Sequence, residues 1–358
     1  MICKENNGQK RLYRRVKKER AINILRGFFV NSQREPKRIV ASVSGIVCVL
    51  LIALGSASGQ TYPAKVITMI VPYPPGGSND VLARHVAQKL TPVLGQNVIV
   101  DNRGGASGAV GADYVAKSAP DGYTLLFNSA SFAASAAGEP NLPFDTEKDF
   151  AAVAGTGAGP FLFTIPPSVP AKSVKEFIEY AKVRPGKLNY ASSGIAGINH
   201  LATELFLHMA KINILHIPYK GMSPAITDLI GGRVQLLITT FPSIGEQVKG
   251  GRVKALAVTT LKRSRFAPEL PTIAEAGVPG YEAKIWWGVF APARTPKPII
   301  DHLNSAMRKI LETADMKEKL ERVGAEPFIQ SPEQFEKTLR SDVAMWRRVM
   351  KDANIKLE

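Results

Sequence analysis

Residues 66–80 read VITMIVPYPPGGSND, and this stretch decides the fold together with the segment that follows it. The β-branched run at its start predicts a buried strand, and the Pro and Gly residues after it predict a loop. From Val81 to Leu94, apolar residues recur at helical spacing opposite a polar face, which predicts a helix packed on a sheet. The apolar positions are Leu82, Val86, Leu90 and Val93. A strand, a loop and a helix in this order are typical of an α/β domain.

The same alternation continues along the chain, and its elements fall into two series. The first series continues with predicted strands at 97–100 and 123–127 around a predicted helix at 110–117. We predict that the loosely patterned stretch 151–159 is the crossing between two lobes. The second series has predicted strands at 161–165, 188–191, 214–218, 234–239 and 253–259 and helices at about 173–182, 199–209 and from 223 onward. A return strand at 281–291, a helix at 299–311 and a final helix from Pro332 to about Lys351 follow. Each lobe is therefore expected to hold a mainly parallel sheet flanked by helices.

The first 59 residues form a segment with its own charge and hydropathy. They hold 12 of the 46 Lys and Arg residues and three of the 30 Asp and Glu residues, so residues 60–358 carry a net charge of only +7. Two basic residues precede the 16 uncharged residues 39–54, and a run of small residues follows. This order is typical of a secretory signal peptide with an extended basic n-region, and the apolar run is shorter than the ~20 residues of a membrane-spanning helix. We predict cleavage between Ala57 and Gln60 and a periplasmic mature protein, and we exclude nucleic acid as a partner of the basic segment.

The sequence offers little support for an enzyme. Both cysteines, Cys3 and Cys48, lie in the predicted signal peptide, so the mature chain has no thiol nucleophile. It contains no G-x-S-x-G elbow and no H-E-x-x-H zinc motif, and the glycine-rich segment 104–111 lacks the spacing of a phosphate cradle. No two of the five histidines have the spacing of metal ligands on one helix, and His200 is expected to be a surface or capping residue. We therefore expect no catalytic residues, no metal and no cofactor.

Two loops each connect a predicted strand to the start of a predicted helix. The first, at 72–80, reads PYPPGGSND, and the second, at 191–199, reads ASSGIAGIN. Glycines let backbone N–H groups approach a ligand, and a helix N-terminus offers unpaired N–H groups and a partial positive charge, which suits a carboxylate. The simpler alternative is that these residues only turn the chain and cap the helices. One such loop in each lobe favours an anion site, because α/β folds bind ligands where strand ends face a cleft.

Candidate binding residues also lie at the ends of two further strands. Polar side chains follow the strand 123–127, and Thr239 and Thr240 end the strand near 234–239, although an ordinary polar turn explains each pair equally well. Tyr73 is a candidate for the wall of the site, whereas Trp286 and Trp287 are predicted to be core residues. The full candidate set is Tyr73, Gly76, Gly77, Ser78, Asn79, Asp80, Asn128, Ser129, Ser131, Ser192, Ser193, Gly194, Ile195, Ala196, Gly197, Thr239 and Thr240.

Several sequence blocks spread over residues 62–355 are collinear with one known family. They are YP at 62–63, IVPYPPGGSND at 70–80, VDNRGGA at 100–106, PDGYTL at 120–125, YASSG at 190–194, PYKG at 218–221 and PTIAEAGVPGY at 271–281. In these blocks the chain resembles the Bug-type receptors of tripartite tricarboxylate transporters. The resemblance covers essentially the whole predicted mature chain.

The resemblance implies an α/β, two-lobed periplasmic-binding-protein fold of type II that closes like a flytrap on a small carboxylate. It implies that the loops matching Tyr73–Asp80 and Ser192–Gly197, one from each lobe, hold the carboxylate partly through water. It also implies a monomer whose partners are the membrane permease subunits of the transporter. Many relatives carry Asp where this chain has Thr239, and they are often more polar at Ile195 and Ala196. These departures point to a ligand without an ammonium group.

We divide the chain into a signal peptide (1–59), a first lobe (60–160 with 285–358) and a second lobe (161–284), with the last helix packed on either lobe. The expected function is capture of a small carboxylate and its delivery to a tripartite tricarboxylate transporter. One alternative is a ligand-sensing protein that docks on the ectodomain of a sensor kinase. Another is a periplasmic enzyme that acts on carboxylates. The sequence does not distinguish aromatic carboxylates, dicarboxylates and short acids as ligands.

Overall fold

The computed structural model describes residues 62–355, so the predicted signal peptide and its cleavage site lie outside the described residues. The strands are β1 (Ile67–Val71), β2 (Val98–Asn102), β3 (Thr124–Ser129), β4 (Phe150–Ile165), β5 (Asn189–Ser192), β6 (Leu215–Pro218), β7 (Leu236–Thr240), β8 (Lys254–Val258), β9 (Lys284–Pro292) and β10 (Glu326–Pro327). The helices are α3 (Ser78–Leu94), the short 3-10 helix η1 (Ala106–Gly108), α4 (Ala109–Ala116), α5 (Ser131–Gly138), α6 (Val174–Lys182), α7 (Ile198–Ala210), α8 (Met222–Ile230), α9 (Phe241–Lys249), α10 (Lys297–Leu311), α11 (Ala314–Arg322) and α12 (Pro332–Asp352).

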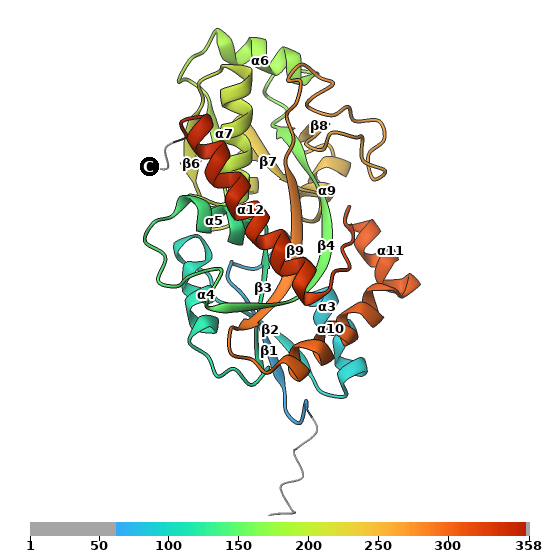
Figure 1. Ribbon diagram of the computed structural model, residues 1–358. Helices are drawn as coiled ribbons and strands as arrows, with labels where there is room; N and C mark the ends of the chain where they lie inside the picture. The colour runs from blue at the N-terminus through green and yellow to red at the C-terminus, as the bar shows by residue number, and fades with distance from the viewer. Residues whose placement is uncertain (1–61, 356–358) are drawn as a thin grey trace, which may run out of the picture. The chain divides into compact units, whose positions relative to one another are not determined.

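The strands form one mixed sheet in the order β2-β1-β3-β9-β4-β7-β5-β6. β1 pairs in parallel with β2 and β3, and β5 pairs in parallel with β6 and β7. Between these two groups, β9 and β4 run antiparallel to their neighbours. Figure 1 shows β1, β2 and β3 in the lower part of the folded unit, β6, β7 and β8 in the upper part, and β4 beside β9 between them. The two parallel groups are therefore linked through the β4–β9 ladder.

The stretch 151–159, predicted as the crossing between the lobes, is a regular strand in spite of its loose sequence pattern. It belongs to β4, a strand of 16 residues that pairs with β9 as far as Pro160 and with β7 and β8 from there on. Its Ala and Gly residues conceal the strand, because side chains this small show no alternation of polar and apolar positions. Small residues are needed here, since a Cβ at Gly155 would lie 2.7 Å from the ring of Phe328. The predicted lobe boundary falls where β4 changes its partners, and the division into lobes remains a prediction.

Most predicted helices are present, with corrections at their ends. α3 begins at Ser78, three residues earlier than predicted, and the predicted core position Val93 is 37% exposed while Leu94 is buried. The sequence patterns do not predict α5, α9 or α11, which have eight or nine residues each. The predicted final helix is confirmed as α12, whose first turn carries a capping box between Ser331 and Gln334.

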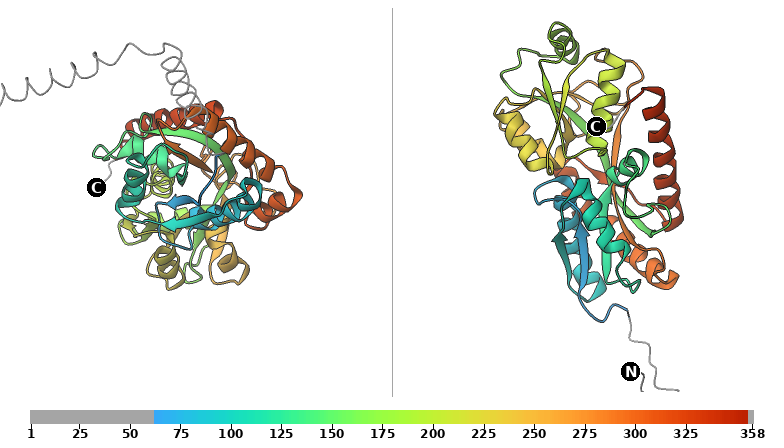
Figure 2. Two further views of the ribbon diagram at one scale, coloured as in Figure 1. Left: turned by 90° about the horizontal axis from the view of Figure 1, so that it is seen from below. Right: turned by 90° about the vertical axis from the view of Figure 1, so that its left-hand side faces the viewer.

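Helix α12 packs on elements from both halves of the folded unit. It contacts α5, α7, α10 and β4, and both views agree that it runs along the long strands (Figures 1 and 2). Its buried side chains, Phe335, Leu339, Val343 and Trp346, recur at helical spacing, which explains the clear sequence signal. Within residues 62–355, no helix combines the length and the apolar character needed to cross a membrane.

Candidate functional site

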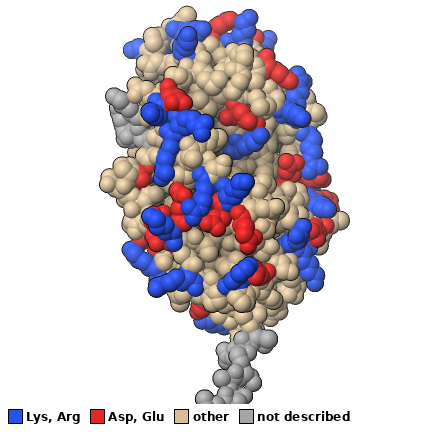
Figure 3. Space-filling view, viewed as in Figure 1, with Lys and Arg blue, Asp and Glu red and all other residues tan. Residues whose placement is uncertain are grey.

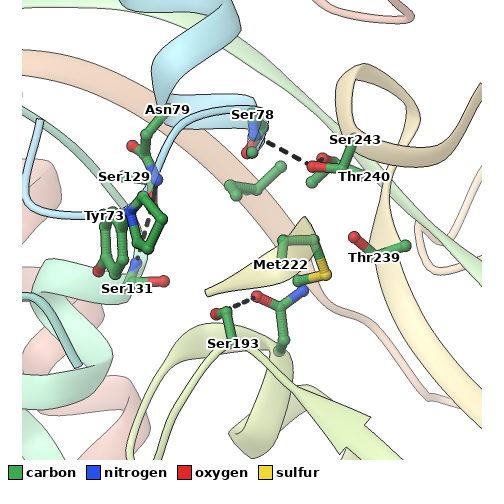
Figure 4. Close-up of a pocket in the computed structure, with 14 residues that line it drawn as sticks. Tyr73, Ser78, Asn79, Ser129, Ser131, Ser193, Met222, Thr239, Thr240 and Ser243 are labelled. Carbon is green, nitrogen blue, oxygen red and sulfur yellow. Dashed lines mark hydrogen bonds between the residues drawn. The ribbon is translucent and has the colours of Figure 1, made fainter. Parts of the chain in front are cut away.

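A small polar cavity with a volume of about 30 Å³ lies where β1, β3, β5 and β7 end. Figure 4 shows polar side chains from several elements around this space. Among the described residues, no Lys, Arg, His, Asp or Glu side chain lines it, whereas charged side chains of both signs are spread over the outer surface (Figure 3). The wall consists of Tyr73, Pro74, Gly77, Ser78, Asn79, Ser129, Ser131, Ser193, Asn199, Met222, Thr239, Thr240, Ser243 and Ile285.

Five helices, α3, α5, α7, α8 and α9, begin at this cavity. Their first-turn residues in the wall are Ser78, Asn79, Ser131, Asn199, Met222 and Ser243. None of the five N-cap residues makes a side-chain cap hydrogen bond. Of the helices that do not reach the cavity, α6, α11 and α12 have such caps and α4 and α10 do not. The first N–H groups of a helix have no acceptor within the helix, and its N-terminus carries a partial positive charge. The wall can therefore bind an anion without a charged side chain.

Hydrogen bonds across the cavity hold its two sides together. The backbone N–H of Ser78 donates to Ser243 Oγ at 3.1 Å, the bond drawn in the upper part of Figure 4. The backbone N–H of Ile198 donates to Ser131 Oγ at 3.3 Å. Both bonds join the part of the chain before residue 160 to the part after it. Each serine thereby satisfies the first N–H of a helix and leaves the following N–H groups of that turn without a protein cap.

Two buried polar atoms at the cavity have no hydrogen-bond partner among the described residues. They are the hydroxyl Oγ1 of Thr239 and the amide oxygen Oδ1 of Asn79. The Thr239 side chain is fully buried, and Asn79 is anchored by its Nδ2, which donates to Ser129 Oγ at 3.4 Å. An unpaired buried polar group costs about 1–3 kcal/mol of stability, which a bound ligand or water recovers. Both atoms are therefore available for a hydrogen bond to a molecule in the cavity.

Asp80 is close to the cavity but is not part of its wall. Its Oδ2 accepts a hydrogen bond from Gly76 N at 3.1 Å, and its Oδ1 lies 2.8 Å from Nη2 of Arg84. Burial alone would raise the pKa of Asp80, but the hydrogen bonds from Arg84 and Gly76 outweigh burial and lower it. The carboxylate is therefore ionised and fixes the shape of the first loop.

The second loop rests on a buried histidine, His200, and a half-buried one, His216. His200 Nδ1 accepts from the backbone N–H of Ala196 at 3.2 Å, and His216 Nε2 lies 2.7 Å from Ser192 Oγ. The two imidazole rings stack with their centres 3.8 Å apart. Burial lowers the pKa of His200 to about 3 and that of His216 to about 4, so both rings are neutral. His200 is only 3% exposed, so the expectation of a surface residue is wrong. Its hydrogen bond holds Ala196 in a left-handed conformation with φ of +59°.

The structure brings together nine of the sequence candidates and places eight outside the cavity wall. Those in the wall are Tyr73, Gly77, Ser78, Asn79, Ser129, Ser131, Ser193, Thr239 and Thr240. Those outside it are Gly76, Asp80, Asn128, Ser192, Gly194, Ile195, Ala196 and Gly197. Whether any of the 17 contacts a ligand remains a prediction. The prediction that Trp286 and Trp287 are core residues is confirmed, since they are 5% and 0% exposed.

Five further residues line the cavity without being sequence candidates: Pro74, Asn199, Met222, Ser243 and Ile285. Asn199 ends the second loop, and Ser243 follows Thr240 by three residues in the first turn of α9, so helix-start patterns could have indicated both. Met222 and Ile285 carry no such signal, because apolar residues in a helix or strand are usually core residues. Among residues 62–355, no group of three or more His, Cys, Asp or Glu residues could hold a metal ion.

Comparison with known proteins identifies the family of this chain. The sequence model of the tripartite tricarboxylate transporter family receptors matches residues 82–355. Protein BugT of Bordetella pertussis is 39% identical over 303 residues, which cover 84% of this chain and 93% of BugT. The structure of R. palustris Rpa4515 with adipate is 38% identical and has a TM-score of 0.81, covering 82% of this chain and 99% of Rpa4515. The periplasmic binding protein BugD is 34% identical with a TM-score of 0.79, covering 83% of this chain and all of BugD.

These similarities confirm the two-lobed α/β fold of periplasmic binding proteins, because the solved structures match along almost their whole length. They also confirm the Bug-type resemblance of the sequence blocks. The family consists of substrate-binding receptors and not of enzymes. On the evidence of its fold, its uncharged cavity and these relatives, the chain belongs to the receptor family of the tripartite tricarboxylate transporters.

Proposed function

We propose that this protein captures a small carboxylate in the cavity between its two lobes and delivers it to a tripartite tricarboxylate transporter. The observation that carries this proposal is the convergence of five helix N-termini without side-chain caps on a cavity without charged side chains. Backbone N–H groups and helix dipoles then supply the positive potential that a carboxylate needs. The adipate in the similar structure of Rpa4515 supports a carboxylate as the ligand.

We assign the contacts of the carboxylate to both sides of the cavity. The N–H groups in the first turns of α3 and α7, near Asn79 and Asn199, donate to its oxygens directly or through water, and the Thr239 hydroxyl donates a further hydrogen bond. Since no acidic side chain among the described residues lines the cavity, an ammonium group would find no counter-charge there. We therefore expect a carboxylate that has no amino group next to it.

Capture requires the lobes, 60–160 with 285–358 and 161–284, to move relative to each other, with β4 and β9 as the connection between them. Closure excludes water, and hydrogen bonds to a carboxylate strengthen as the local dielectric constant falls. We place the mature protein in the periplasm after removal of residues 1–59. There, the closed form is the one presented to the permease subunits.

A thermal-shift experiment tests the binding proposal. Residues 60–358 are purified, unfolded and refolded to remove bound ligand, then heated with carboxylates, amino acids and neutral sugars. A ligand at 100 times its Kd adds roughly 2.7 kcal/mol to the free energy of unfolding, which gives a measurable shift in Tm. We expect shifts with a few carboxylates only. Shifts with sugars or cationic compounds alone would contradict the anion site.

Uptake measurements separate transport from sensing. A strain that lacks this receptor is expected to lose uptake of the radiolabelled carboxylate that stabilises the purified protein. Normal uptake combined with loss of a transcriptional response to that carboxylate would instead identify a sensing role. As a control, the gene for the receptor is returned to this strain on a plasmid, which should restore uptake.

A further inference from the structure

A second cavity lies beside the polar cavity, and Tyr73 belongs to the walls of both. Its volume is about 490 Å³, against about 30 Å³ for the polar cavity. It is bounded by α4, by α5 with the loop after it, and by Ile195 of the second binding loop. Asn128, which precedes the polar-cavity residue Ser129 on β3, also lines it. The two cavities are therefore neighbouring compartments that share Tyr73, β3 and the second loop.

The wall of the second cavity is largely apolar. Its apolar members include Val110, Phe132, Leu142, Phe144 and Ile195. Val110 is 53% exposed in the first turn of α4, so part of its apolar side chain is accessible from the cavity. An apolar group in this cavity would cover Val110 and gain the free energy of its own burial.

The charged residues of the second cavity are both acidic. Asp113 forms an ion pair with Lys117 at 2.7 Å, and Glu139 Oε1 accepts from the backbone N–H of Asn141 at 3.2 Å. Among the described residues, no Lys or Arg side chain belongs to the wall. Asp113 is neutralised by Lys117, but Glu139 forms no ion pair among the described residues, so a second carboxylate beside Glu139 would meet a like charge and the wall disfavours dianions.

Tyr73 lies between the two cavities and carries no charge. Burial raises the pKa of Tyr73 to about 12, so its phenol is neutral. The ring lies against Gly108, where a Cβ would come within 3.1 Å of the Tyr73 hydroxyl. Gly108 also has φ of +100°, so both its conformation and its missing side chain let the ring occupy this position. The ring offers a flat apolar face against which an alkyl chain can pack.

We infer that the second cavity binds the apolar tail of a monocarboxylate whose carboxylate group is held in the polar cavity. The ligand class is thus an alkyl or arylalkyl monocarboxylate and not a dicarboxylate. The inference rests on the proposed function, because it assumes that the helix N-termini hold the carboxylate.

Isothermal titration calorimetry with refolded protein tests this inference. The probes are butyrate, hexanoate, octanoate, 3-phenylpropionate and adipate. We expect affinity to rise about fourfold for each methylene added from butyrate to octanoate, since a buried methylene contributes roughly 0.8 kcal/mol. Hexanoate and adipate have six carbons each, and we expect adipate to bind about tenfold more weakly or worse because of its second charge.

A pair of matched variants locates the tail. Val110→Asp adds a charge to the second cavity only, so we expect octanoate to lose about tenfold or more in affinity while butyrate is unaffected. Val183→Asp changes a valine that is 74% exposed at the end of α6, outside both cavities, and should leave both affinities unchanged. Melting temperatures check that both variants fold, which their exposed positions favour.

Three results would overturn the inference while the proposed function stands: equal affinities for butyrate and octanoate, adipate binding more tightly than hexanoate, or equal losses for both acids in Val110→Asp. Failure of every carboxylate to bind the wild-type protein would overturn the proposed function and the inference together.

Discussion

Replacing Thr239 by valine should separate ligand binding from stability. Thr239 is fully buried on β7, and its hydroxyl has no partner among the described residues. Valine has nearly the same shape and removes only the polar atom. We therefore expect Thr239→Val to fold at least as stably as the wild type and to bind its carboxylate more weakly.

The magnitudes follow from the two states of this hydroxyl. In the ligand-free protein, removing an unpaired buried hydroxyl should raise the free energy of unfolding by about 1 kcal/mol. In the complex, the variant loses a hydrogen bond to a charged group, which contributes about 1.5–3 kcal/mol. The dissociation constant should therefore rise by roughly 10-fold to 100-fold.

Thr164→Val provides a matched control on the neighbouring strand. Thr164 on β4 is also fully buried, but its Oγ1 donates to the carbonyl oxygen of Leu237 at 2.6 Å. It does not line the polar cavity. Its replacement should lower the free energy of unfolding by about 1 kcal/mol and leave the affinity unchanged.

Urea unfolding of ligand-free protein and calorimetric titration with the tightest carboxylate measure the two quantities for each variant. The argument predicts opposite outcomes for the two threonines. If Thr239→Val loses stability as Thr164→Val does and keeps its affinity, the hydroxyl is a structural group and our assignment of it to the ligand is refuted.

Two further predictions concern the first loop and the stacked histidines. Gly77→Val should abolish carboxylate binding while Tm changes little. The φ of −83° at Gly77 accepts a side chain, and a Cβ there would lie 3.7 Å from Met222, so the added methyl groups occupy the cavity without a clash. Normal affinity in a calorimetric titration would contradict this prediction. The lowered pKa values of His200 and His216 mean that the unfolded chain binds more protons below pH 6.5, so their contribution to stability is complete above pH 6.5 and is lost toward pH 4. As the pH falls through that window, we expect the free energy of unfolding to fall by about 1–2 kcal/mol per pH unit. This range allows for the partial exposure of His216 and for the raised pKa of Glu204, which acts in the opposite direction. His200→Gln should reduce this slope in urea titrations, and an unchanged slope would count against the assignment.

The stacked histidines show where sequence reasoning stops. His200 at the start of a helix looks like a surface residue, because its sequence neighbours do not reveal that His216, 16 residues away, stacks on it. The same holds for Met222 and Ser243, which reach the cavity because α8 and α9 begin close to the start of α3. Such contacts depend on the packing of distant segments.

The sequence by itself determined the two strand–loop–helix units at 66–94 and 188–209, the family, and the backbone character of the binding loops. These properties are local, since hydrophobic period, glycine and proline positions and helix-start residues act over a few residues. The tertiary structure alone decided that β4 continues through 151–159, that five uncapped helix N-termini meet at one cavity, and that Tyr73 separates it from an apolar one. The physical reason is that strand pairing and helix convergence are set by the burial of side chains from remote parts of the chain, and no local pattern records which of them will meet.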